Sequence, residues 1–155
     1  MKLYLCAFSF ILFSQMAFAQ NIPQNPNKTD KKGLRQGKWT ICYNQDWNIV
    51  IDCKSATYYR LITYQDDKPI GKVTDHYRSG KVQMEARLLA DRPQEIFEGV
   101  AMWYREDGTK ETERVFKNGQ AESEKNFDTQ GKEITCTWKQ VYEAAEKVYD
   151  SEDYA

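Results

Sequence analysis

The sequence has one histidine, His76, among its 155 residues, and it contains no Cys-x-x-Cys pair. Zinc sites in proteins use three or four closely spaced histidine, cysteine or carboxylate ligands, and no such spacing occurs here. The sequence also lacks the Gly-x-Ser-x-Gly, His-Glu-x-x-His and glycine-rich phosphate-binding motifs that mark hydrolases, metalloproteases and nucleotide-binding proteins. We therefore expect a protein that is not an enzyme and that carries no metal or cofactor.

Few residues remain as candidates for catalysis. One is His76 as a general base, and the others are two acidic pairs, Glu95 with Glu98 and Asp66 with Asp67. A lone histidine beside a turn is more typical of a surface residue, and acidic pairs in loops are usually solvated. Two catalytic carboxylates would also need a cleft between them, which a thin sheet does not offer. A small hydrolase is therefore a weaker hypothesis than either of the two non-catalytic functions considered below.

Long apolar runs are missing except at the N-terminus. There Lys2 precedes an apolar stretch from Leu3 to Phe13, and Ala17-Phe18-Ala19 supplies the small-x-small pattern that a signal peptidase cleaves. The stretch is too short to span a bilayer as a helix. We interpret residues 1–19 as a signal peptide, with an uncleaved membrane anchor as the alternative. The mature chain is then exported to the periplasm, the cell surface or the medium, with no transmembrane segment.

An excess of positive charge is also missing, because 22 Lys and Arg face 23 Asp and Glu and the formal net charge is −1. Loss of Lys2 with the signal peptide makes the mature chain one unit more negative. Proteins that bind nucleic acids present a basic face to the phosphates. The charge balance therefore argues against a nucleic-acid partner.

Only four cysteines are present, and Cys6 lies within the signal peptide. In an oxidising compartment the other three, Cys42, Cys53 and Cys136, allow three pairings. The segment from Cys42 to Cys53 resembles two short strands folded about residues 46–48, which places the two cysteines opposite each other. We therefore expect a cross-strand Cys42–Cys53 disulfide, and Cys136 is left as the odd thiol, free or paired between chains.

Short alternating stretches separated by turn residues fill most of the remaining chain. Apolar side chains occupy the even-numbered positions of Val82–Leu88, and Val100, Met102 and Tyr104 repeat the spacing. We expect a mainly β fold, an elongated antiparallel meander of stacked hairpins over residues 37–138. Residues 20–36 are polar with two prolines and predict an extended linker. Apolar residues recur at helical spacing from Trp138 to Tyr149 and predict a short capping helix and an acidic tail over 139–155, with a partner-binding helix as the alternative.

The stretch from Lys110 to Asp128 contains few apolar side chains. It cannot supply one layer of a two-layer sandwich, because each strand offers only one or two groups to a core. We expect a thin sheet at this end, held by cross-strand pairs of opposite charge that contribute about 0.2–1 kcal/mol each.

Glycines and aromatic residues recur along the chain, with 27 residues from Tyr77 to Tyr104 and 23 from Tyr104 to Phe127. The matching positions are Gly71 with Tyr77 and Gly80, Gly99 with Tyr104 and Gly108, and Gly119 with Phe127 and Gly131. This pattern resembles the bacterial variant of the MORN repeat, a short hairpin unit found in tandem in envelope proteins and in proteins labelled YwqK-type antitoxins. The resemblance covers roughly residues 33–133 and departs from the pattern between residues 42 and 64. It implies a twisted sheet that acts as a platform and implies no activity, and the antitoxin label fits poorly with export.

Four Trp and ten Tyr are more aromatic surface than a thin sheet can bury. Trp47 and Trp103 flank turns and are the candidate binding surface, with packing between hairpins as the alternative. The leading hypothesis is an exported, non-catalytic interaction or structural module of the cell envelope. Its partner would be an envelope protein, for example in an outer-membrane or secretion assembly. The main alternative is a glycan- or lipid-binding domain that uses the exposed aromatic residues.

Overall fold

The structure is a computed structural model that describes residues 21–135. The expected signal peptide (1–19), Cys136 and the expected C-terminal helix (139–155) lie outside these residues. Within residues 21–135, no helix has the length and apolar character needed to cross a membrane.

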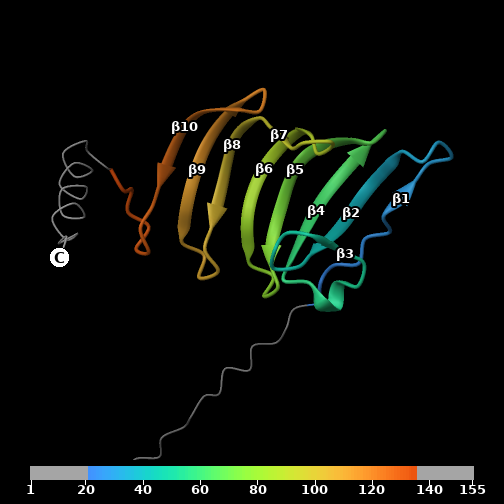
Figure 1. The fold of residues 1–155 in the computed structure, drawn as a ribbon, viewed down its shortest axis with the longest axis horizontal. Helices are drawn as coiled ribbons and strands as arrows, with labels where there is room; N and C mark the ends of the chain where they lie inside the picture. Colours follow the sequence, from blue (N-terminus) through green and yellow to red (C-terminus); the bar gives the residue numbers. More distant parts are fainter. Residues whose placement is uncertain (1–20, 136–155) are drawn as a thin grey trace, which may run out of the picture.

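Ten strands of the described chain form one antiparallel sheet, in which strands that follow one another lie side by side apart from the short β3 and β7 (Figure 1). The order is β1-β2-β4-β5-β6-β8-β9-β10, with β3 paired to β2 and β7 paired to β6. The strands are β1 (Lys28–Thr29), β2 (Arg35–Tyr43), β3 (Ile49–Val50), β4 (Tyr58–Gln65), β5 (Lys68–Tyr77), β6 (Val82–Ala90), β7 (Ile96–Phe97), β8 (Gly99–Tyr104), β9 (Lys110–Lys117) and β10 (Gln120–Asn126). A 3-10 helix, η1 (Cys53–Ser55), precedes β4. The prediction of a mainly β antiparallel meander is confirmed.

One kind of turn recurs five times in the described chain. The N–H of its first residue donates to the carbonyl of the fifth, and the N–H of the fourth donates to the carbonyl of the first. The five turns begin at Asp30, Asn44, Tyr77, Arg105 and Asp128. In four of them the fourth residue is a glycine at positive φ, namely Gly33, Gly80, Gly108 and Gly131. Glycine adopts this conformation without steric cost, so the turn residues of the sequence direct the meander.

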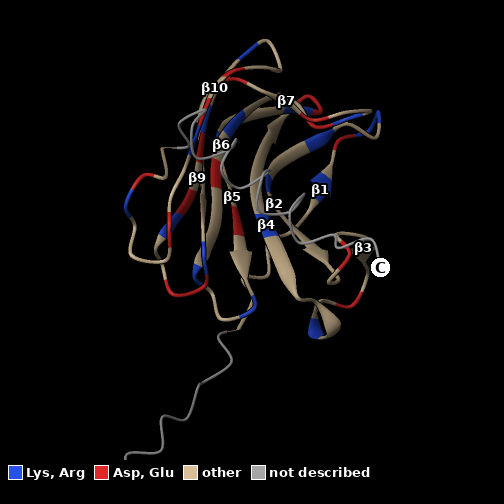
Figure 2. Cartoon of the chain, turned by 60° about the vertical axis from the view of Figure 1, so that its left-hand side comes forward, with Lys and Arg blue, Asp and Glu red and all other residues tan. Residues whose placement is uncertain are grey.

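The face of the sheet that carries Val73, Met84 and Leu88, called the inner face below, bears two of the three buried clusters. A single sheet can bury side chains when it curls, and the strands curve around this face (Figures 1 and 2). The β6–β8 connection (residues 91–98, including β7) folds over the inner face, where Phe97 packs against both clusters. Residues 21–135 therefore close a core without a second sheet.

Strand β6 follows the predicted alternation, whereas β8 presents the opposite face. Ala101 is 1% exposed and packs in the core, but Val100 is 57% exposed. The register with β6 is the reason, because it pairs Trp103 with Met84 and so places Ala101 and Trp103 on the inner face. Alternation predicts a period of two, but it does not say which of the two sets of side chains is buried.

The sheet is thin at β9 and β10, as the polar sequence predicts. Every residue of β10 is exposed. Charges of both signs mark these strands in Figure 2, and Arg114 donates to its cross-strand partner Glu124 at 2.5 Å. Exposed pairs of this kind contribute little. The edge is attached by the backbone ladder with β8 and by Phe116, whose ring stacks on that of Phe97 with centroids 4.9 Å apart.

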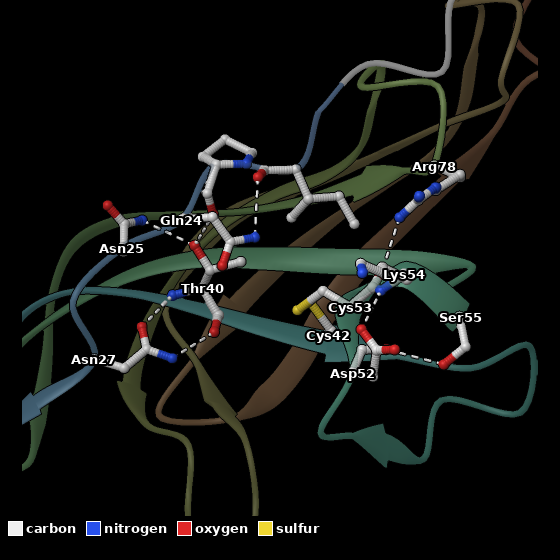
Figure 3. Close-up of a disulfide and its surroundings, with 12 residues drawn as sticks. Gln24, Asn25, Asn27, Thr40, Cys42, Asp52, Cys53, Lys54, Ser55 and Arg78 are labelled. Carbon is white, nitrogen blue, oxygen red and sulfur yellow. Dashed lines mark hydrogen bonds between the residues drawn. A yellow bond between two sulfur atoms is a disulfide. The ribbon is translucent and has the colours of Figure 1, made fainter.

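Residues 21–36 differ from the extended linker that the sequence predicts for 20–36. The N-terminal arm (residues 21–27) packs on the outer face of the sheet, where Ile22 is buried against Cys42. Asn27 donates to the carbonyl of Thr40 and accepts from its N–H, each at 2.8 Å (Figure 3). Strand β1 then pairs with β2, which begins before the expected domain boundary at residue 37. Two polar side chains of the arm, Asn25 and Asn27, bond to Thr40 of β2, whereas most of the others are exposed to water as the sequence predicts.

The Cys42–Cys53 disulfide is confirmed, with Cα atoms 5.4 Å apart (Figure 3). Its setting differs from the expected cross-strand pair, because Cys42 pairs with Val50 of β3 and Cys53 lies beyond the strand, in η1. Asp52 accepts a hydrogen bond from the N–H of Lys54 at 2.9 Å and so caps η1. The disulfide itself and Arg78, which donates to the carbonyl of Cys53 at 2.7 Å, hold the short helix against the sheet.

Replacing Cys42 and Cys53 by alanine is expected to lower the free energy of unfolding by about 2–3 kcal/mol. The bond closes a short loop, with a sequence separation of 11 residues, and so restricts the unfolded chain. Urea unfolding of the double variant and of the oxidised wild type measures the difference. Amides of the N-terminal arm should also exchange faster with solvent in the variant, since Ile22 packs on Cys42. Equal unfolding midpoints would contradict a stabilising role of the bond.

Candidate binding site on the inner face

A pocket of about 380 Å³, called the inner-face pocket below, opens on the inner face of the sheet. It is lined by Tyr43, Trp47, Arg60, Asp75, Gln83, Met84, Glu95, Phe97 and Trp103. Both candidate binding residues of the sequence, Trp47 and Trp103, are among them. Strands β2 and β8 are four steps apart in the sheet order, roughly 19 Å in a flat sheet. The curl of the sheet brings the two indoles to one site, which corrects the expectation that a thin sheet offers no cleft.

Trp47 occupies the turn position that holds glycine in the four other turns of its kind. Its φ is 60°, a conformation that costs a bulky L-residue about 1–2 kcal/mol. Aromatic contacts offset part of this cost. The indole stacks on the ring of Tyr58, with centroids 4.4 Å apart, and its centroid lies 5.4 Å from that of the Tyr43 ring. The residue is nevertheless 40% exposed. Strained positions of this kind cluster at functional sites, so the turn favours a functional role for the indole.

An ion-pair network of the buried Arg60 and Asp75 with the exposed Glu95 forms the polar part of the pocket. Arg60 Nε and Nη2 donate to the two carboxylate oxygens of Asp75 at 2.7 and 2.8 Å, and Nη1 donates to Glu95. Burial raises the pKa of Asp75, and the hydrogen bonds from Arg60 oppose that shift. Burial acts to lower the pKa of Arg60, but its bonds to Asp75 leave that pKa raised. Both oxygens of Asp75 accept from one guanidinium, so we assign the pair as ionised, and with Glu95 the trio carries a net charge of −1.

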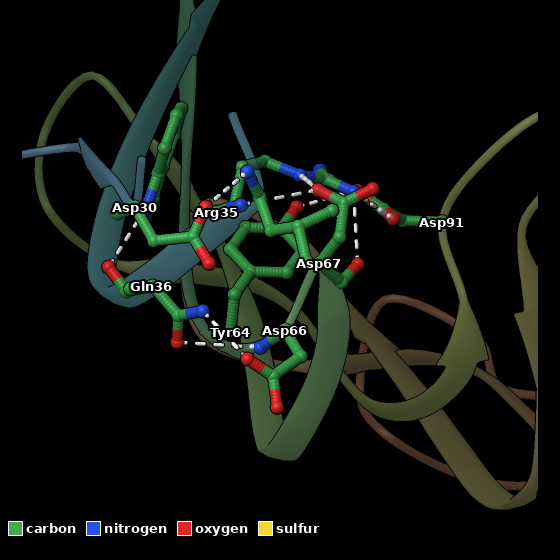
Figure 4. A network of polar contacts seen from close by, with 9 residues as sticks. Asp30, Arg35, Gln36, Tyr64, Asp66, Asp67 and Asp91 are labelled. Atoms are coloured by element: carbon green, nitrogen blue, oxygen red, sulfur yellow. Dashed lines mark hydrogen bonds and ion pairs between the residues drawn. The ribbon is translucent and has the colours of Figure 1, made fainter. Parts of the chain in front are cut away.

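A second buried arginine holds the β6–β8 connection near its start. Arg35 Nη1 and Nη2 donate to the two oxygens of Asp91 at 2.5 and 2.9 Å (Figure 4). The hydroxyl of Tyr64 donates to Asp91 as well, and the guanidinium of Arg35 lies 3.8 Å from the Tyr64 ring centroid. Asp91 and Glu95 both belong to the connection. The two arginines therefore fix it over the inner face, which sets Phe97 in the wall of the pocket.

Gln83 reaches the pocket through a β-bulge. The register of β5 against β6 shifts between Asp75 and His76, which pair with Met84 and Val82, and Gln83 is left without a strand partner. A bulge turns a side chain out of the regular alternation. Gln83 Oε1 is buried and accepts no hydrogen bond from any residue within 21–135. Buried acceptors in proteins are nearly always paired, so a rotation of the Gln83 amide toward the pocket that it lines would pair this oxygen with a donor on a ligand.

The residues considered for catalysis do not assemble in the pocket, apart from Glu95. The ring nitrogens of His76 lie 3.0 Å from the carbonyl of Gly80 and 2.9 Å from the hydroxyl of Thr74. The other three acids have partners elsewhere: Glu98 accepts from Asn118, Asp66 from Gln36 and Asp67 from Arg35. No group of three or more His, Cys, Asp and Glu side chains in the described range is placed to hold a metal ion.

The repeat positions lie outside the inner-face pocket and connect neighbouring hairpins. The hydroxyl of Tyr77 donates to the carbonyl of Tyr104 at 2.8 Å, and Arg105 Nη2 donates to the carbonyl of Phe127 at 2.6 Å. Gly71 and Tyr104 line a shallow groove on the outer face. The glycines that open the three repeats, Gly71, Gly99 and Gly119, all have positive φ.

Sequence reasoning found the two indoles of the pocket but missed Arg60, Asp75 and Gln83. The arginine and the aspartate look like ordinary strand residues, and the bulge at Gln83 has no signature in the sequence. One signal was present at Trp47. The turn NQDWN (residues 44–48) has the same length as DKKGL, REDGT and DTQGK, and it places tryptophan where they place glycine.

Comparison of the chain with protein-family models, with curated proteins and with solved structures gives no match. Its function is therefore inferred from the residues of the inner-face pocket.

Proposed function

We propose that this chain is an exported, non-catalytic β-sheet protein of the bacterial cell envelope that binds a partner through the inner-face pocket. The observation that carries the proposal is Trp47, a tryptophan that is 40% exposed at a turn position that otherwise holds glycine. Binding without chemistry is supported by Arg60, which engages both carboxylates that line the pocket. Neither acid is then left as a free proton donor or acceptor for a reaction.

Export and an envelope location rest on the N-terminal sequence and on the disulfide. Residues 1–19 have the pattern of a signal peptide, and a structural disulfide persists in an oxidising compartment. The resemblance to the MORN-repeat variant supports a platform role for the sheet. We propose that the partner is a component of the envelope, for example in an outer-membrane or secretion assembly.

The proposal predicts that Trp47→Gly abolishes partner binding and leaves stability nearly unchanged. Glycine relieves the strain at positive φ, about 1–2 kcal/mol, and this offsets the lost contacts of the indole. The measurement is affinity capture from envelope extracts with the immobilised exported chain, alongside thermal unfolding of each variant. The wild type should retain a component that Trp47→Gly does not retain.

The matched control is Val100→Ala, which removes an exposed apolar side chain from the outer face. This variant should retain the same component as the wild type. If wild type and Trp47→Gly capture the same components, the pocket is not the binding site. If Trp47→Gly unfolds far below the wild type, Trp47 serves the fold and not a partner.

A further inference from the structure

We propose that the inner-face pocket binds the ring of a neutral, hydroxyl-rich sugar that forms part of an envelope glycan. This inference rests on the proposed function, because it names the ligand class of the same site. Four aromatic side chains line the pocket together with an arginine, two carboxylates and an amide. Small-molecule sites typically combine an apolar lining with a few convergent polar groups, in volumes of about 300–1,000 Å³. A pocket of about 380 Å³ suits one or two sugar rings.

The charge of the pocket favours a neutral ligand over an anionic one. Arg60 is its only cation among the described lining residues, and Asp75 and Glu95 both accept from it. The remaining charge is negative, and the buried Gln83 Oε1 is another acceptor. A carboxylate or phosphate on the ligand would meet repulsion here and find no unpaired cation.

A cationic ligand is disfavoured by arginines that already lie near two of the rings. The guanidinium of Arg114 lies 5.5 Å from the ring centroid of Trp103, and that of Arg60 lies 5.8 Å from the ring centroid of Tyr43. An ammonium group on a ligand that contacted these rings would therefore be repelled by a guanidinium group that already lies beside them. A lipid chain is disfavoured for another reason, since it would cover the exposed carboxylate of Glu95 and would supply no donor to Gln83 Oε1.

A pyranose supplies both hydrogen-bonding groups for the polar residues of the pocket and an apolar surface for its aromatic rings. Its hydroxyl groups donate to Glu95 and Gln83, and they accept from the remaining N–H groups of Arg60. The C–H bonds on one side of the ring form an apolar surface that packs against an indole. The rings of Tyr58 and Tyr43 fix the indole of Trp47 in place, with centroids 4.4 and 5.4 Å from that of the indole. An indole held in place loses little freedom when the ligand binds.

Isothermal titration calorimetry of the full exported chain tests the proposal with four neutral trisaccharides: maltotriose, cellotriose, mannotriose and triacetylchitotriose. Trigalacturonate is the anionic probe and tetramethylammonium the cationic one. We expect at least one neutral sugar to bind with a Kd of about 1 mM or tighter. Trp47→Gly and Gln83→Leu should each weaken that binding by about tenfold or more. Val100→Ala on the outer face and Gln130→Leu in a distant turn should bind as the wild type does.

The outcomes separate this inference from the proposed function. No heat from any of the four sugars, or tighter binding of either charged probe, overturns the assignment to a neutral sugar. If affinity capture still depends on Trp47 in that case, the pocket binds a partner of another class and the proposed function stands. If capture fails as well, both are overturned. Sugar binding that survives Trp47→Gly and Gln83→Leu unchanged places the sugar elsewhere on the protein and also overturns the inference.

Discussion

Arg60→Met is expected to lower the free energy of unfolding by about 3–5 kcal/mol, because it leaves a buried carboxylate without its counter-ion. Asp75 is that carboxylate, with a side chain that is 3% exposed and accepts two hydrogen bonds from Arg60. Methionine is flexible enough to fill the space of the arginine stem, so the loss arises mainly from the uncompensated charge. Equilibrium unfolding in urea at neutral pH measures it.

The double variant Arg60→Met with Asp75→Leu is the control for that interpretation. Replacing both members of a buried ion pair with apolar side chains is often neutral or stabilising. We therefore expect the double variant to regain most of the stability that Arg60→Met loses. If the two variants are equally unstable, packing and not the buried charge accounts for the loss.

Asp91→Ala is expected to cost about 1–3 kcal/mol at neutral pH, since it removes both hydrogen bonds that the buried Arg35 donates to Asp91 and leaves Asp67 as the remaining carboxylate partner. The same substitution removes an acceptor of the Tyr64 hydroxyl. The β6–β8 connection then loses its first attachment to the sheet, and residues 91–98 should exchange their amide hydrogens faster. The exposed Asp46 in the β2–β3 turn gives the matched control, because Asp46→Ala removes a carboxylate with no buried partner.

The cost of Asp91→Ala should depend on pH in one direction. Burial acts to raise the pKa of Asp91, but hydrogen bonds from Arg35 and Tyr64 leave it lowered from the ordinary value of 3.8. An acid whose pKa is lowered by folding contributes stability that is fully present above its unfolded pKa and lost as the pH falls through its folded pKa. The difference between wild type and variant should therefore hold from neutral pH to about pH 5 and shrink below pH 3.8. A difference that grows on acidification would contradict this assignment.

The hairpins could be predicted from the sequence because turn chemistry is local. Gly80, Gly108 and Gly131 stand where positive φ is required, and the alternation in β6 identifies a strand whatever its neighbours are. The thin, charged end of the sheet could be predicted for a similar reason, since a strand without apolar residues cannot belong to a core. The Cys42–Cys53 bond followed from proximity in the chain, although the wrong local structure was expected around Cys53.

The candidate site could be predicted only in part, because its residues are distant in the chain. Trp47 and Trp103 were selected as aromatic residues beside turns, but the sequence did not place them together. Arg60 and Asp75 form a pair across two strands whose register depends on the bulge near Gly71. Gln83 enters the pocket through a bulge that only the pairing of β5 with β6 creates.

The sequence by itself determined the period of the strands, the position of the turns and the thinness of the C-terminal edge. These properties depend on residues a few positions apart. The turns depend on which residues tolerate positive φ, and the strands depend on how many apolar side chains they offer for burial. The tertiary structure alone decided which face of β8 is buried, how far the sheet curls and that residues 91–98 fold over it. Those outcomes depend on contacts between side chains that are far apart in sequence, above all the two buried arginines and their carboxylates, and no local pattern encodes such contacts.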